Sequence, residues 1–128
     1  MYLIISFFLI ITGIAMIIIW LSDIDNKADI DFSEGFFKAR EKDSGNVFWF
    51  HIITELITGI LLIFSGIILL SSVIRLLPLV YFSLGLLFYS SFNSLGWAFA
   101  SKSRASYRIP MISGLLISVL SFLILLIG

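Results

Sequence analysis

Four long apolar runs constrain the fold of this chain more than any other feature of its sequence. They cover residues 2–21, 47–70, 78–100 and 109–127. Each run has about the 20 residues that an α-helix needs to cross the hydrocarbon core of a bilayer. With 60% hydrophobic and 12% charged residues, the composition lies far from that of a water-soluble domain. We therefore expect an all-α integral membrane protein, a single domain folded as an up-down four-helix bundle in the lipid bilayer.

The segment 22–46, between the first two runs, holds most of the charged residues. Within it, Asp31 followed three residues later by Glu34 resembles a capping box, and Gly45 can end a helix. This pattern predicts a short helix lying on the membrane surface. A plain solvated loop is the alternative, and the sequence does not decide between the two.

The second run carries the two ionisable residues that most need an explanation. Glu55 is the only acidic side chain within the four runs, and His51 is the only histidine of the chain. An ionised carboxylate in hydrocarbon is costly unless it has a partner or a proton. Residues four apart lie on one face of a helix, so we expect His51 and Glu55 to face the other helices together.

Further polar side chains fall at a similar depth in the neighbouring runs. A helix rises about 1.5 Å per residue, so the distance of a residue from the end of its helix measures its depth in the bilayer. Counted in this way, seven residues are predicted to gather in a polar pocket in one half of the bundle: Thr12, His51, Glu55, Thr58, Asn93, Ser94 and Ser113. We expect this pocket to bind a small solute, a proton or a cation.

Three residues of this predicted pocket also have structural explanations. His51 can be a ring at the headgroup boundary, where amphipathic aromatic side chains concentrate. A hydrogen-bonded Glu55 can hold helices together, and Asn93 can do the same at a helix contact. The sequence leaves these alternatives open.

Lysine and arginine predict the orientation of the bundle. Seven of the eight follow the first and third runs: Lys27, Lys38, Arg40, Lys42, Lys102, Arg104 and Arg108. The other side has Arg75 alone. Since cytoplasmic loops carry the excess of positive charge, we expect loops 22–46 and 101–109 in the cytoplasm and both termini outside, in a plasma membrane. Three tryptophans fall near this end, as expected for an interfacial belt: Trp20, Trp49 and Trp97.

Composition argues against several kinds of chemistry. The net charge of zero gives no reason to expect a nucleic-acid partner. The chain has no cysteine, which excludes disulfides and thiolate chemistry. His51 and Glu55 offer two metal ligands, whereas protein metal sites use three or more, so we expect no metal, and no cofactor is indicated.

Three functional hypotheses follow from these observations. The first is transport of a small solute, proton or cation through a site at Glu55, in a homo-oligomer because one small bundle encloses little interior. The second is an accessory subunit of a larger membrane complex, with no activity of its own. The third, and the less favoured because no strained nucleophile turn is evident, is an enzyme that acts on a lipid at the cytoplasmic interface with His51 as base.

Overall fold

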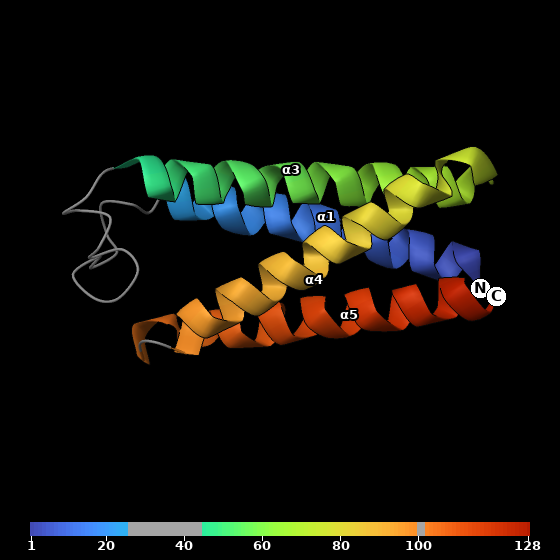
Figure 1. Cartoon of the computed structure of the whole chain (residues 1–128). Coiled ribbons are helices and arrows are strands. Elements are labelled where there is room, and N and C mark those ends of the chain that lie inside the picture. Colours follow the sequence, from blue (N-terminus) through green and yellow to red (C-terminus); the bar gives the residue numbers. More distant parts are fainter. Residues whose placement is uncertain (26–44, 100–101) are drawn as a thin grey trace.

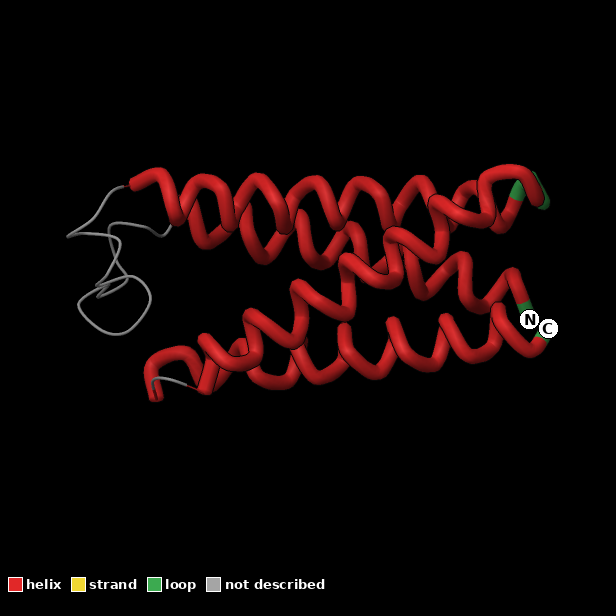
Figure 2. The backbone as a smooth tube through the Cα atoms, viewed as in Figure 1, coloured by secondary structure: helices red, strands yellow, loops and turns green. Residues whose placement is uncertain are grey.

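A computed structural model describes residues 1–25, 45–99 and 102–128. In this part of the chain all regular structure is helical: α1 (Tyr2–Asp25), α3 (Gly45–Leu70), η2 (Ile74–Leu76), α4 (Leu77–Phe99), η3 (Lys102–Tyr107) and α5 (Arg108–Ile127). Figure 2 shows that helices make up almost all of the described part of the chain. Each long helix has a segment long and apolar enough to cross a membrane. The predicted all-α architecture of four membrane-spanning helices is therefore confirmed.

The observed helix ends lie within a few residues of the predicted ones. α1 continues through Asp25, beyond the predicted end at residue 21, and α3 begins at Gly45, before the predicted start at residue 47. The loop predicted at 101–109 contains η3 and the start of α5. The predicted surface helix within 22–46 lies outside the described residues.

The four helices form two antiparallel pairs, α1 with α3 and α4 with α5 (Figure 1). α4 crosses the molecule diagonally, so it contacts α3 as well as α5, whereas α1 and α5 touch only slightly. Both termini lie at the same end of the bundle (Figure 1). α4 is therefore the element that joins the two pairs.

Small residues set the close packing of α1 on α3. A Cβ atom added at Gly13 would lie 2.5 Å from the carbonyl oxygen of Gly59, and one added at Gly66 would lie 2.7 Å from that of Ser6. Ser6 and Gly13 are seven residues apart on α1, as are Gly59 and Gly66 on α3, so the two helices meet at matching intervals. Glycine at these positions lets the backbones approach without a side chain between them.

The turn between α3 and α4 is a Schellman motif built on Ser72. The N–H groups of Val73 and Ser72 donate hydrogen bonds of 3.3 Å to the carbonyls of Ile68 and Leu69. This geometry holds Ser72 at a φ of 55°, in the left-handed region. Pro78 then occupies the second position of α4, where its missing N–H costs no helical hydrogen bond.

Arg108 closes the connection between α4 and α5. Its Nε donates a hydrogen bond of 3.2 Å to the carbonyl of Ala98, and its guanidinium lies 4.5 Å from the centre of the Phe99 ring. A cation at the C-terminus of a helix also interacts favourably with the helix dipole. This connection holds the far end of α4 against α5.

Candidate functional site

Glu55 lies on the face of α3 that packs against α4. The buried residues of this face follow one another at alternating spacings of three and four: Glu55, Thr58, Leu62, Ser65 and Leu69. That spacing produces a continuous stripe along one side of a helix. Only 2% of Glu55 is exposed, so its carboxyl group is enclosed by protein rather than by acyl chains.

Two serines of α4 bind the carboxyl group of Glu55. The hydroxyl of Ser90 donates a hydrogen bond of 2.5 Å to Oε2, and the hydroxyl of Ser94 lies 3.5 Å from Oε1. Because these serines are four residues apart, both face α3 from adjacent turns of α4. Hydrogen bonds to both oxygens reduce the free energy needed to bury the carboxyl group.

His51 approaches the same carboxyl group from the preceding turn of α3. Its Nε2 lies 3.9 Å from Oε1 of Glu55. The imidazole ring stands edge-on to the ring of Trp20 on α1, with the ring centres 4.9 Å apart and the planes at 86°. Trp20 is fully buried beside this ring. Side chains from α1, α3 and α4 therefore meet at Glu55.

The structure brings together three of the seven predicted site residues: His51, Glu55 and Ser94. Thr58 is buried one turn further along α3, where its hydroxyl donates a hydrogen bond of 2.8 Å to the carbonyl of Thr54. Thr12 is half-buried on α1 and makes no hydrogen bond to Glu55 within the described part of the chain. These two threonines therefore lie at about the depth of Glu55 in the bundle but do not bond its carboxyl group.

Asn93 and Ser113 are not brought to Glu55. Both are exposed on the outer surface of the bundle, and the hydroxyl of Ser113 donates a hydrogen bond of 2.9 Å to the carbonyl of Ile109 in its own helix. The depth of a residue gives its position along the helix axis but not its direction around that axis. Successive residues of a helix turn by about 100°, so Asn93 lies to one side of the face that Ser94 shares with Ser90, where it is exposed.

Two residues of the site were not predicted. Ser90 is not among the seven predicted residues, although its spacing of four from Ser94 places it on the same face of α4. Trp20 was assigned to an interfacial belt, whereas it is buried against His51. Because tryptophan favours both environments, its sequence position near a helix end does not distinguish them.

A second polar contact joins α3 to α4 nearer the other end of the bundle. Ser65 donates a hydrogen bond of 2.9 Å to the hydroxyl of Ser83, which itself donates one of 2.8 Å to the carbonyl of Leu79. Between the two contacts lie Leu62 and Leu87, both buried. The ionisable groups are therefore confined to one half of this helix interface, with an apolar layer beyond them.

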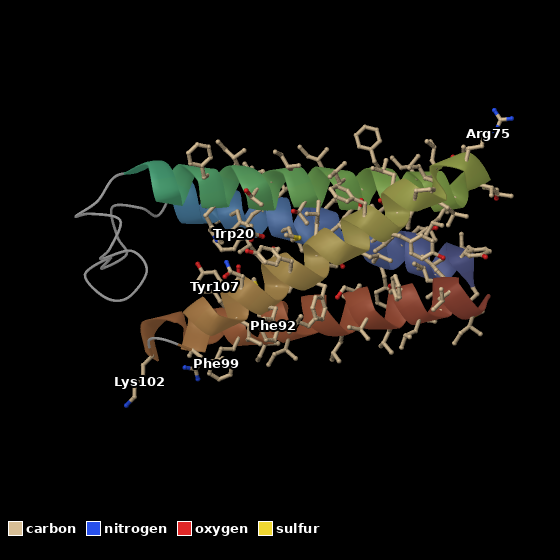
Figure 3. The ribbon with its side chains drawn as sticks, in the orientation of Figure 1. Trp20, Arg75, Phe92, Phe99, Lys102 and Tyr107 are labelled. Carbon is tan, nitrogen blue, oxygen red and sulfur yellow. The ribbon has the colours of Figure 1, made fainter. Side chains whose placement is uncertain are left out.

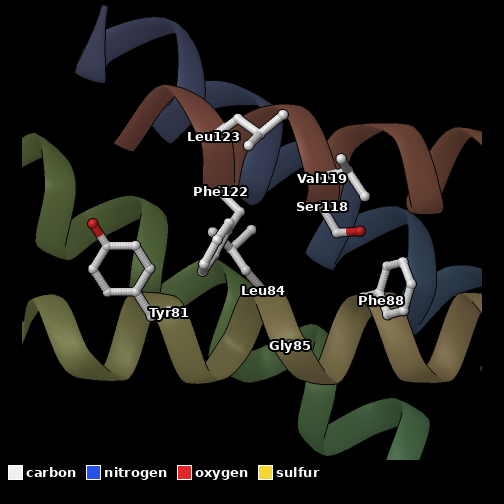
Figure 4. Close-up of a pocket in the computed structure, with 8 residues that line it drawn as sticks. All are labelled: Tyr81, Leu84, Gly85, Phe88, Ser118, Val119, Phe122 and Leu123. Atoms are coloured by element: carbon white, nitrogen blue, oxygen red, sulfur yellow. The ribbon is translucent and has the colours of Figure 1, made fainter. Parts of the chain in front are cut away.

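Two clefts lie elsewhere on the bundle. One, of about 230 Å³, opens between α4 and α5 and is almost entirely apolar (Figure 4); it is lined by Tyr81, Leu84, Gly85, Phe88, Ser118, Val119, Phe122 and Leu123. The other, of about 430 Å³, lies beside the turn at Ser72. Glu55 lines neither cleft. In the described ranges, no three His, Asp or Glu side chains lie together as metal ligands would.

Comparison with known proteins does not place the chain in a family. No family model matches it, and neither a curated protein nor a solved structure matches it. Its function must therefore be argued from the chemistry of the site around Glu55.

Proposed function

We propose that this protein binds a proton or a small cation at Glu55 and uses that site in the transport of a small solute across the membrane. The observation that carries the proposal is a buried glutamate, only 2% exposed, between two membrane-spanning helices, with the single histidine of the chain 3.9 Å from its carboxyl group. Acidic side chains within membrane-spanning helices are costly, and they commonly belong to ion pathways or proton relays.

The neighbours of Glu55 can serve both of its charge states. An ionised carboxylate accepts hydrogen bonds from Ser90 and Ser94, whose hydroxyls already lie at its two oxygens. A protonated carboxyl group instead needs an acceptor for its own O–H, and the Nε2 of a neutral His51 can reach it after a small rotation. Proton exchange at Glu55 would therefore change the contact between α3 and α4.

We further propose that the end of the bundle near the site faces the cytoplasm. Lys102 and Arg75 are exposed at opposite ends of the molecule (Figure 3), and both termini share the end of Arg75. Trp20 and Tyr107 lie toward the end of Lys102 (Figure 3). Seven of the eight basic residues follow the first or the third apolar run in the sequence, as Lys102 does, so the positive-inside rule favours this orientation. Glu55 and His51 would then exchange protons with the cytoplasm.

An accessory role is the second function that a specific observation favours. The 2.5 Å hydrogen bond from Ser90 satisfies Oε2 of Glu55 within the chain, as expected for a residue that only joins helices. In that role the ionisation of Glu55 would be irrelevant, and a glutamine would serve as well. The Glu55→Gln substitution therefore separates the two functions.

Proton flux into reconstituted vesicles tests the proposal. Vesicles would hold a trapped pH-sensitive dye, and a potassium diffusion potential set with valinomycin would drive protons inward. We expect flux from the native chain, loss of flux in Glu55→Gln, and native flux in Ser113→Ala, whose hydroxyl bonds only its own helix. Thermal unfolding would establish that both variants fold. Equal flux from native protein and Glu55→Gln, or no flux above that of empty vesicles, would contradict proton transport at Glu55.

A further inference from the structure

One face of α4 points away from the rest of the bundle and carries two polar groups within the membrane-spanning segment. Its residues recur at spacings of three and four, with Asn93 beside them: Phe82, Gly85, Tyr89, Phe92, Asn93 and Gly96. All six are exposed, including 68% of Tyr89 and 65% of Phe92, and Gly85 also borders the open cleft between α4 and α5. We call this set the outer face of α4.

Asn93 is an expensive residue to expose to acyl chains. Its neighbour Ser94 lies against Glu55, so the amide is at the depth of the buried acid and not beyond the end of the span. An amide carries two donors and an acceptor, and leaving these unpaired in hydrocarbon costs several kcal/mol. Within the described part of the chain, Asn93 has no hydrogen-bond partner.

Other exposed polar residues of the spans avoid this cost. Thr54 and Ser113 each donate a hydrogen bond to the carbonyl four residues earlier in the same helix, at 2.7 Å and 2.9 Å. The amide of Asn93 and the hydroxyl of Tyr89 do not bond their own helix in this way. Asn93 and Tyr89 lie four residues apart, so both polar groups face one side of α4.

We propose that the outer face of α4 pairs with the same face of a second copy of this chain. An amide is self-complementary, because its NH₂ group donates hydrogen bonds and its carbonyl oxygen accepts them. With a two-fold axis beside Asn93, the amide of each copy can therefore bond the amide of the other. Copies inserted in one orientation place their α4 helices parallel, which brings Asn93 level with its equivalent. No charged side chain lies on this face, so no partner of opposite charge is required.

Packing on the outer face favours the same arrangement. An added Cβ atom at Gly85 or at Gly96 would meet nothing within 4 Å, so both glycines leave room for a second backbone to approach. Spacings of three and four alternate along this face, from Phe82 through Tyr89 to Gly96. Two helices that pack at a small crossing angle meet at this repeat. This pairing does not depend on the role of Glu55.

Disulfide cross-linking in native membranes tests the pairing, because the chain has no cysteine of its own. In a parallel two-fold pair, Phe92→Cys and Gly96→Cys each face their own equivalents, so we expect oxidation to give covalent dimers. Ile57→Cys on α3 and Leu116→Cys on α5 are also exposed and serve as lipid-facing controls. Equal dimer yields at the control positions and at Phe92→Cys and Gly96→Cys would overturn the proposal. Cross-links from Phe92→Cys to a different protein would overturn it as well.

A second measurement isolates the amide. Asn93→Leu replaces it with an apolar side chain of similar size, and dimerisation can be followed by energy transfer between labelled chains in vesicles of increasing lipid content. We expect the variant to dissociate at a lipid-to-protein ratio about fivefold to thirtyfold lower than the native chain does, because it loses interhelical hydrogen bonds in the bilayer. Ser113→Ala should leave dimerisation unchanged. An unchanged dimer in Asn93→Leu would overturn the role of the amide.

Discussion

The hydroxyl of Ser90 on α4 donates a hydrogen bond of 2.5 Å to Oε2 of Glu55 on α3. This contact links the α1–α3 pair to the α4–α5 pair at the depth where the chain carries its buried acid. The strength of the link can be measured separately from any transport activity.

A double-mutant cycle between Glu55→Gln and Ser90→Ala should reveal coupling between the two side chains. We expect Ser90→Ala to lower the free energy of unfolding by about 1–2 kcal/mol, because it leaves Oε2 without its donor. The loss should be smaller in the Glu55→Gln background, since an amide bonds a hydroxyl less strongly than a carboxylate does. Reversible unfolding in mixed micelles gives these values. Additive effects would show that the two residues do not interact.

Packing at the crossing of α1 and α3 should depend on Gly13. We expect Gly13→Ala to destabilise the protein by about 1–3 kcal/mol, because the added Cβ meets the carbonyl of Gly59 and the helices must separate. Gly85→Ala is the matched control, provided that both variants are unfolded at a protein-to-detergent ratio low enough to keep the chain monomeric, because Gly85 also lies on the proposed pairing face of α4. It adds a Cβ that meets nothing, so the better helix propensity of alanine should leave stability equal or higher. Equal losses in thermal unfolding at the two positions would contradict the close crossing.

The architecture follows from the sequence because a single physical rule governs it. A backbone in hydrocarbon must satisfy its own hydrogen bonds, so each apolar run of sufficient length becomes a helix. The spacing of His51 and Glu55 also placed them on one face, and their contact at 3.9 Å agrees with it. Both inferences concern residues of the same helix or run, where geometry is local.

Direction around a helix was harder to predict, as Asn93 illustrates. In a water-soluble protein the apolar face marks the core, but lipid is as apolar as leucine, so here the pattern carries little information. The buried face of α4 is instead marked by small hydroxyl residues, among them Ser83, Ser90 and Ser94. Those serines already indicate which side of α4 faces Glu55, and Asn93 lies beside that side and not on it. The contact between Gly13 and Gly59 could not be predicted either. It depends on how far α1 is shifted along α3, and the sequence of one helix alone does not specify that shift.

Replacing Ser72 by glycine should stabilise the turn between α3 and α4. Ser72 holds a φ of 55°, a conformation that costs a residue with a Cβ about 1 kcal/mol and costs glycine almost nothing. We expect Ser72→Gly to raise the free energy of unfolding by up to about 1 kcal/mol. Ser71→Gly should lower it, because Ser71 follows directly on α3 and its N–H still bonds the carbonyl of Ile67. A loss of stability in Ser72→Gly would contradict the left-handed conformation of this residue.

Removal of Trp20 should disturb both stability and the position of His51. Trp20 is fully buried, and a tryptophan-to-alanine change at such a position costs about 3–5 kcal/mol. Trp20→Phe keeps an aromatic ring near His51 and should cost much less. Thermal unfolding measures the difference, and NMR of the imidazole in Trp20→Phe reports whether His51 stays in place. Similar losses in both variants would show that ring packing is not what stabilises this contact.

Labelling of single cysteines should report the proposed orientation. A membrane-impermeant maleimide applied to intact cells is expected to label Arg75→Cys and to leave Lys102→Cys unlabelled until the membrane is opened. Both positions are exposed, so accessibility to reagent depends only on the side of the membrane. The reverse pattern would place Glu55 and His51 toward the outside and would contradict the orientation.

The most direct test of the central claim is to observe whether Glu55 binds and releases a proton in the folded protein. Infrared difference spectra of the protein in vesicles, recorded between pairs of pH values, detect the C=O band of a protonated carboxyl group. Our account predicts a band that appears as the pH falls, that Glu55→Gln removes and that Ser113→Ala retains. Identical difference spectra for the native chain and Glu55→Gln, across the pH range in which both stay folded, would contradict it.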